Sequence, residues 1–274
     1  MMSADDILLI LRLAWPIESS GSSGSCRVSP HPAANSCHHH AVSPLRYTCR
    51  RGTPSLTGLI NDPAWDKVPW TSDFVDIEGD KQPLPRFKTR AKMLWDSEFL
   101  YVASWMEEPQ AWATLTEHDS VIFHDNDFEV FIDPDGDAQR YFEFEVNALG
   151  TTWDLYLALP YRDGGSADNS WESDALVRVH VDGALNDASA GSKSWSVELA
   201  FPWQPFRANG GVPCPPIAGD TWRINFSRVQ WLVDVVEGRY RKRPDQTEAN
   251  WVWSPQGVID MHQPEQWGYL DFAN

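Results

Sequence analysis

The chain has 274 residues, of which 42% are hydrophobic and 22% charged, the ordinary balance of a globular protein. It also contains 15 tryptophans and carries a formal net charge of −17. A surface this acidic repels phosphate backbones and anionic lipid, so we expect neither a nucleic-acid nor a membrane partner. We also expect a monomer.

The first 45 residues differ in amino-acid composition from the rest of the chain. A short apolar run at residues 7–13 follows Asp5 and Asp6, where a signal peptide needs positive charge, and it is too short to span a bilayer. We therefore predict neither a convincing signal peptide nor a transmembrane helix, and the compartment stays open. Residues 16–45 are rich in Ser, Gly, Pro and His, which predicts a disordered extension over residues 1–45. Its Cys37–His40 run has metal-binding side chains, but His runs in such sequence are usually adventitious.

The four cysteines match no zinc-ribbon or CxxC spacing. Isolated thiols are the simpler interpretation. A single bridge between Cys49 and Cys214 is the alternative if the protein is secreted.

From residue 46 onward, short stretches alternate apolar and polar residues with period two, which predicts β-strands. Residues 46–49 predict a short edge strand, and residues 61–68 predict a helical turn with Pro63 at its first position. Further strands are predicted at residues 87–95, 99–106, 127–133, 141–148, 151–159, 175–181, 194–201 and 220–231. About ten short strands without a sustained helical period predict an all-β, antiparallel β-sandwich over residues 46–274.

The segment from Asp119 to Gly150 has the most informative pattern. Apolar and acidic residues alternate along both of its predicted strands, and the intervening Pro134–Asp137 has a turn composition in which Gly136 supplies a positive φ. The pattern predicts a hairpin with one apolar face and one acidic face. Because like charges on one sheet face repel each other, we expect the acidic face to need a cation, a metal or a polyhydroxylated ligand.

Six segments in a fixed order carry a resemblance to a known family: LINDPAW at 59–65, AKMLWDSEFLYV at 91–102, NDFEVFID at 126–133, WSVELAFPW at 195–203, WRIN at 222–225 and PEQWGYL at 264–270. Together they resemble a family 9 carbohydrate-binding module, a DOMON-like sandwich with an immunoglobulin-like two-sheet architecture, over residues 54–274. The resemblance implies non-catalytic binding of a poly- or oligosaccharide, or of a sugar terminus, linked to carbohydrate breakdown.

Members of that family hold a terminal sugar ring between two tryptophans, with carboxylate, amide and arginine groups at its rim. At the corresponding positions this chain has Phe123 and Met261 as platforms, Glu129 as a supporting glutamate, and Glu145 where the family has an arginine. The full set of predicted sugar-binding residues is Phe123, Asn126, Glu129, Glu145, Asn147, Trp153, Trp171, Asn225, Arg228, Trp251 and Met261. The alternative is an Arg–Glu network that closes the sheet against a loop, in which Arg223 and Arg228 are the counterparts of the acidic face and the aromatic residues are core.

Two acids on one sheet face also raise the question of catalysis. A glycosidase needs two carboxylates roughly 5 to 9.5 Å apart. Glu143 and Glu145 are two residues apart on one predicted strand, about 6 to 7 Å by the strand rise. A glycoside hydrolase acting on O-glycosyl bonds with Glu129, Glu143 and Glu145 is therefore the first alternative function.

The turn of the hairpin offers a candidate metal site. Asp133, Asp135 and Asp137 present hard oxygen ligands at alternate positions around a glycine, as a calcium loop does. The resemblance adds that family members often bind structural calcium, so we expect a structural calcium ion here. An acidic turn without a metal is the alternative.

A haem-binding, electron-transfer domain is the second alternative function, because some DOMON-like sandwiches hold haem between a Met and a His or Lys. Met106, Met261 and His262 are the candidate axial ligands. A methionine is, however, usually a core residue.

Overall fold

The computed structural model of the protein describes residues 45–274. This part of the chain forms strands β1 to β15 and six short 3-10 turns, and it contains no α-helix. It likewise has no helix long and apolar enough to cross a membrane. The all-β prediction is therefore confirmed. The predicted N-terminal extension, with its Cys37–His40 run, lies outside the described residues except for Leu45.

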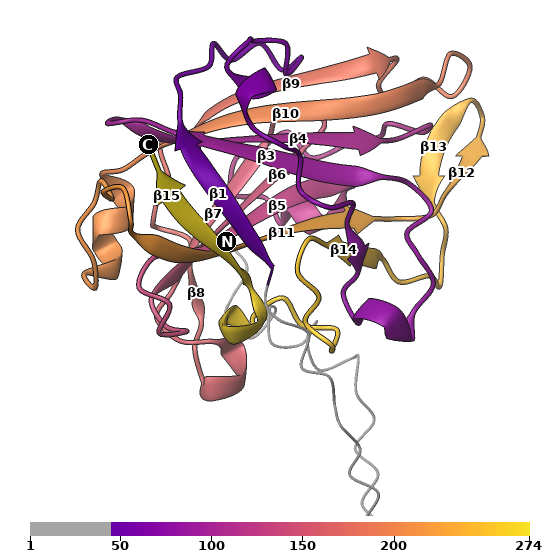
Figure 1. The fold of residues 1–274 in the computed structure, drawn as a ribbon. Helices are drawn as coiled ribbons and strands as arrows, with labels where there is room; N and C mark the ends of the chain where they lie inside the picture. The colour runs from indigo at the N-terminus through magenta and orange to yellow at the C-terminus, as the bar shows by residue number, and fades with distance from the viewer. Residues whose placement is uncertain (1–44) are drawn as a thin grey trace, which may run out of the picture. The chain divides into compact units, whose positions relative to one another are not determined.

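Most strands belong to one sheet that folds over on itself (Figure 1). Its hydrogen-bonded order is β8 (Ala167–Asp168), β7 (Thr152–Leu157), β6 (Tyr141–Asn147), β5 (Asp127–Asp133), β11 (Thr221–Gln230), β15 (Gly268–Ala273), β1 (Arg46–Arg51), β3 (Thr89–Trp95), β4 (Phe99–Glu107), β10 (Ser192–Pro202) and β9 (Leu176–Gly183). Strand β14 (Ala249–Val252) pairs with β11 and with β2 (Val75–Asp76), while β12 (Val233–Val236) and β13 (Arg239–Lys242) form a separate hairpin.

Strand β1 corrects the prediction of an edge strand in a fully antiparallel sheet. It pairs in parallel with β15 on one side and with β3 on the other, so it lies inside the sheet at the join between its two halves. Tyr47 and Cys49 point into the core, whereas Arg46 and Arg50 are exposed. This half-polar alternation is typical of an edge strand, and only the pairing with the C-terminal β15 gives β1 its internal position.

The core lies between the two halves of the folded sheet. The apolar face of the β5–β6 hairpin packs here, and the ring of Phe144 on β6 lies 5.0 Å from that of Phe201 on β10. The predicted inward residues of the hairpin, Phe128, Val130 and Ile132, are all buried in this cluster. Burying a side chain of this size is worth roughly 1.5 to 3 kcal/mol relative to leaving it exposed. We call the cluster of buried apolar residues between the two halves of the sheet the inner core.

The two cysteines of the described chain are not bridged. Cys49 is buried on β1 and Cys214 is half-buried in the segment before β11, and both are free thiols. The alternative of a Cys49–Cys214 disulfide is therefore not formed in this structure. Burial raises the pKa of both thiols.

Candidate functional site

Four carboxylates share the face of the β5–β6 hairpin that points away from the inner core: Asp127 and Glu129 on β5, and Glu143 and Glu145 on β6. Glu129 lies directly opposite Glu145 in the strand register. Single oxygens of Asp127, Glu129 and Glu145 lie within 4.8 Å of one another. The period-two pattern predicted correctly that these acids share one face. It did not predict that all four are at most 5% exposed.

Burial governs the electrostatics of this acidic face. It raises the pKa of Glu129 to about 7, and it raises the pKa of Asp127, Glu143 and Glu145 well above their ordinary values, with mutual repulsion adding to the effect. Within residues 45–274, no lysine or arginine nitrogen lies within 4.0 Å of these carboxylates, and the closest basic atom is His262 Nε2, 3.9 Å from Glu143 Oε2. Burial lowers the pKa of His262 to about 4, so this histidine is neutral near pH 7.

Apolar side chains surround the acidic face and form a second cluster, the outer cluster. Both predicted platform positions belong to it: Met261 is buried, and Phe123 is half-buried and packs against it. The ring of Phe123 lies 6.3 Å from that of Trp153, and its backbone N–H donates to Glu145 Oε2 at 2.9 Å. The outer cluster consists of Ile77, Ile122, Phe131, Tyr141, Trp153, Leu155, Leu157, Val252, Met261 and Trp267, with Leu115, Val121, Phe123, Tyr161 and Ala167 packed against it.

Three residues of this region were not predicted to bind sugar. The ring of Tyr161 lies 4.5 Å from that of His262, and the Tyr141 hydroxyl lies 2.9 Å from His262 Nδ1. Burial raises the pKa of the Tyr161 hydroxyl, and the charges of Glu143 and Glu145 add to this effect. Two sequence signals pointed to this region: the period-two alternation, which places Tyr141 on the same face as Glu143 and Glu145, and the position of His262 beside Met261. Tyr161 reaches the face from a loop and has no such signal.

Four buried polar atoms of the acidic face and its neighbouring strands have no hydrogen-bond partner among the described residues. They are two carboxyl oxygens, one N–H donor and one hydroxyl: Asp127 Oδ2, Glu143 Oε2, Trp153 Nε1 and Ser227 Oγ. A buried polar group without a partner costs about 1 to 3 kcal/mol. Groups of this kind are rare in folded proteins and mark places where a ligand can supply the missing hydrogen bonds.

The structure places two of the predicted aromatic residues elsewhere. Trp251 is buried in the inner core, and the half-buried Trp171 packs against that core, with its ring 4.7 Å from that of Phe142. Phe142 points to the opposite side of β6 from the acidic residues. Neither tryptophan therefore borders the acidic face.

Arg228 also lies on the inner side of its strand, and it forms a buried ion pair with Glu108 at 3.1 Å. It further donates to Thr89 and Gln230. Arg223 donates to a backbone carbonyl and lies over the Tyr269 ring. An Arg–Glu network therefore exists, but it uses Glu108, so the two arginines are not counterparts of the acidic face.

The three predicted amides hold backbone segments together. Asn126 accepts the backbone N–H of Trp231, and Asn225 both donates to and accepts from the backbone of Ser254. Asn147 donates to a carbonyl in the loop before β5 and accepts two amides of its own turn. Their hydrogen-bonding capacity is used inside the fold.

The predicted calcium residues do come together, since single oxygens of Asp133, Asp135 and Asp137 lie within 4.8 Å of one another. Their hard oxygens suit calcium. The chain already supplies a cation, however: Arg140 Nη2 lies 2.8 Å from Asp135 and 2.7 Å from Asp137. Asp133 accepts the backbone amides of the turn, and burial raises its pKa to about 7. An ion would have to displace Arg140, so calcium stays a prediction.

The candidate haem ligands are not assembled. Met106 lies in the inner core, whereas Met261 and His262 lie at the outer face of the sheet. Met261 and His262 are sequence neighbours, and they belong to the surroundings of the acidic face.

The sequence matches the family model of the carbohydrate family 9 binding domain-like proteins over residues 56–212. No curated protein matches the chain. Among solved structures, a family 9 carbohydrate-binding module from Caldicellulosiruptor kristjanssonii in complex with cellotriose is 15% identical, with a TM-score of 0.55, and the match covers 84% of this chain and 94% of that one.

Two further structures have the same fold. The same organism's module in complex with glucose is 16% identical with a TM-score of 0.54, over 84% of this chain and 96% of that one. A protein from Bacteroides uniformis is 17% identical with a TM-score of 0.58, over 84% and 100%. These likenesses confirm the predicted two-layer β-sandwich. The family match covers more than half of the chain, which therefore belongs to the carbohydrate family 9 binding domain-like family.

Proposed function

We propose that this protein is a non-catalytic carbohydrate-binding module whose ligand contacts the acidic face of the β5–β6 hairpin. The observation that carries the proposal is the set of unpartnered buried atoms, Asp127 Oδ2, Glu143 Oε2 and Trp153 Nε1, beside the apolar surfaces of Phe123 and Met261. A sugar offers both counterparts: hydroxyls that donate and accept, and a C–H face that packs on apolar rings.

The raised pKa values suit a neutral ligand rich in hydroxyls. Burial raises the pKa of Glu143 and so favours its protonated form, which donates one hydrogen bond and accepts others. An ionised pair at the same place would only accept, and it would repel itself. A sugar hydroxyl accepts a hydrogen bond at its oxygen and donates one through its hydrogen. The acidic face can therefore satisfy both roles.

The family and the solved structures support this ligand class. The two Caldicellulosiruptor modules hold cellotriose and glucose. We infer that a glucose-based oligosaccharide or its terminus is the first ligand to test. Met261 stands at one platform position, where its unbranched side chain can adapt to a ring but stacks less rigidly than tryptophan.

Glycoside hydrolysis is the second candidate. Glu129 faces Glu145 across the strand pair, and burial raises the pKa of Glu143, as a general acid requires. Membership of a family of binding modules favours binding without catalysis.

Calorimetric titration with glucose, cellotriose and a panel of neutral oligosaccharides tests the proposal. We expect binding by the wild type, and an affinity about 5- to 150-fold lower in Phe123→Ala and Glu143→Gln, because each change removes about 1 to 3 kcal/mol of packing or hydrogen bonding. Glu265→Gln, an exposed change of the same chemistry, is the matched control and should bind like the wild type.

Two outcomes would overturn the proposal. The first is the absence of binding across the panel; the second is equal affinity of wild type, Phe123→Ala and Glu143→Gln. Release of reducing sugar by the wild type, lost in Glu143→Gln, would instead establish the hydrolase.

A further inference from the structure

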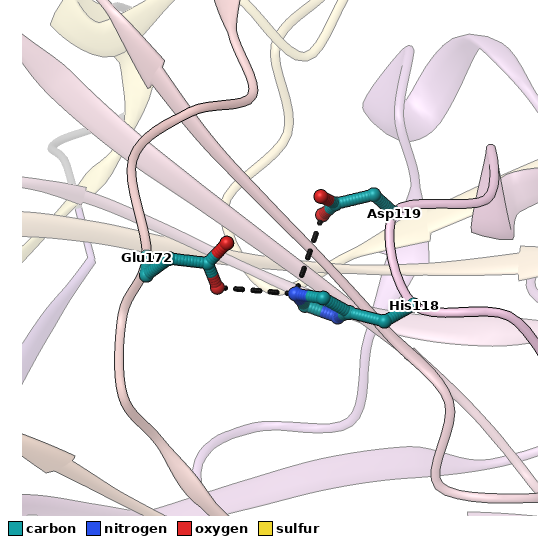
Figure 2. Close-up of side chains that lie close together, drawn as sticks. All are labelled: His118, Asp119 and Glu172. Carbon is teal, nitrogen blue, oxygen red and sulfur yellow. Dashed lines mark hydrogen bonds and ion pairs between the residues drawn. The ribbon is translucent and has the colours of Figure 1, made fainter. Parts of the chain in front are cut away.

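A histidine and two carboxylates meet on the surface between two loops (Figure 2). His118 and Asp119 lie in the segment that joins β4 to β5, and Glu172 lies in the segment that joins β8 to β9. His118 Nε2 is 3.0 Å from Glu172 Oε2 and 3.5 Å from Asp119 Oδ1. No sequence pattern predicted this cluster, because Glu172 lies 53 residues beyond Asp119 and 54 beyond His118 along the chain.

Thr152 contacts the other ring nitrogen of the histidine. His118 Nδ1 lies 3.1 Å from the carbonyl oxygen of Thr152 and 3.0 Å from its hydroxyl oxygen. In the tautomer that carries its hydrogen on Nδ1, this nitrogen donates to the carbonyl oxygen, and the lone pair of Nε2 points at two carboxylate oxygens. A cation in front of Nε2 would then be bound by all three groups.

Unpartnered oxygens provide a second, independent observation. Asp119 Oδ1, which faces His118, is buried and accepts no hydrogen bond from the described residues. A fourth carboxylate, Asp154, is 3% exposed; its Oδ2 accepts the Ser173 N–H at 2.8 Å, while its Oδ1 is also unpartnered. The charge of Asp154 acts on His118, and that of Glu172 acts on Asp154. One imidazole thus lies among three acidic groups, an excess of negative charge that a dication would balance.

We propose that His118, Asp119 and Glu172 bind a divalent transition-metal ion, with zinc the best match. Imidazole nitrogen and carboxylate oxygen are zinc ligands, and with bonds of about 2.0 to 2.1 Å the ligand atoms of a tetrahedral site lie roughly 3.3 Å apart. The two measured separations, 3.0 and 3.5 Å, lie on either side of this value. A metal-binding histidine also typically donates its other N–H to a carbonyl or carboxylate, and His118 Nδ1 lies within hydrogen-bond distance of such a carbonyl, that of Thr152.

The ion would join the β4–β5 loop to the β8–β9 loop. His118 and Asp119 precede the 3-10 turn Ile122–His124, which carries the candidate platform Phe123. Glu172 is in a loop with no strand pairing to that turn. Joining the two segments through a metal would therefore stabilise the loop that borders the acidic face, whether or not that face binds carbohydrate.

Zinc titration of the full chain tests the site, provided that the His38–His40 run is removed as a competing ligand. In a His38→Ala, His39→Ala, His40→Ala background, calorimetry should give one equivalent of zinc, and the melting temperature should rise with zinc and fall back with chelator. The cobalt complex should show the visible absorption of a tetrahedral site. His118→Gln and Glu172→Gln should each weaken zinc binding by at least about 10-fold, as removing even an outer-shell partner does.

His180→Gln is the matched control, because His180 is exposed on β9 and belongs to no such cluster among the described residues. It should bind zinc like the parent. Equal melting temperatures of all variants in chelator would show that they fold alike, which their exposed positions favour. The proposal is overturned if the parent binds no zinc, or if His118→Gln and Glu172→Gln bind zinc as the parent does.

Discussion

Two buried regions of this sandwich contain acidic side chains, and they differ in whether a basic residue pairs with them. In one, Glu108 and Arg228 are each 1% exposed and form an ion pair at 3.1 Å, with further donors and acceptors around them. In the other, the acidic face of the β5–β6 hairpin buries four carboxyls with no lysine or arginine within ion-pair distance among the described residues. In the first region each charged group has a partner of opposite charge. In the second no such partner is available within residues 45–274, and burial raises the pKa of all four carboxyls.

The two regions differ in whether their buried polar groups are compensated within the fold, and this distinguishes a structural role from a binding role. Burying a charge is tolerated when a partner and hydrogen bonds compensate it, as at Arg228, and such a pair needs no ligand. The acidic face lacks this compensation, and it retains unpartnered atoms at Asp127, Glu143 and Trp153. Uncompensated polar burial lowers stability, so its presence on one face of a hairpin is better explained by binding than by folding.

The largest expected effect comes from breaking the paired region. Glu108→Ala leaves Arg228 buried without its partner, which should lower the free energy of unfolding by about 3 to 5 kcal/mol. Glu265→Ala, which removes an exposed partner of Arg162, should cost less than about 1 kcal/mol. Urea denaturation of both variants measures this contrast. Equal losses would mean that burial does not distinguish the two pairs.

The unpaired region should show its raised pKa values as a pH dependence of stability. The pKa of Glu129 is about 7 in the folded protein, against an ordinary value of 4.5. Between these two values the unfolded chain has lost this proton while the folded protein keeps it. The free energy of unfolding therefore falls as pH rises through this window, by about 3 kcal/mol in total. Below pH 4.5 both states are protonated and this group has no effect.

Glu129→Gln removes this contribution, so the variant should gain stability relative to wild type between pH 5 and pH 8. The comparison must be a difference between the two proteins, because the lowered pKa of His262 acts in the opposite direction: its contribution is lost as pH falls from 6.5 towards 4. Urea denaturation at several pH values provides the measurement. Parallel pH profiles of wild type and variant would contradict the assignment.

The smallest expected effect concerns the turn of the same hairpin, where Arg140 and calcium are alternative cations. We expect added calcium to raise the melting temperature, by about 2 to 4 °C for each kcal/mol of stabilisation. Arg140→Gln frees Asp135 and Asp137 and should enlarge the response, whereas Arg162→Gln, an arginine paired elsewhere, should not. If neither calcium nor chelator shifts the melting temperature of any of these chains, the calcium site is removed from consideration.

Much of the fold was predictable because strand faces are a local property. Alternation along residues 127–133 and 141–147 assigned the inner and outer side chains of the hairpin correctly. The same reasoning could not detect the hairpin of β12 and β13, whose strands have four residues each. It also misjudged β1, because its alternation is the same for an edge strand and for a strand that joins two halves of a sheet.

The candidate site was only partly predictable. Phe123, Glu129, Glu145, Trp153 and Met261 do gather around one face. Arg228 and the two tryptophans Trp171 and Trp251 do not, because their sides of the chain pack into the inner core. Residues that arrive on loops, such as Tyr161 and Glu172, have no periodic signal that links them to their partners.

By itself, the sequence determined the fold class, the positions of the main strands along the chain, and the two faces of the β5–β6 hairpin, one apolar and one acidic. These follow from the pleat, which sends successive side chains to opposite faces of a strand. Only the tertiary structure decided that the acidic face is buried rather than solvated, that Arg228 pairs with Glu108, and that His118 meets Glu172. These properties depend on which loops cover which face, and distant contacts of that kind leave no periodic trace in the chain.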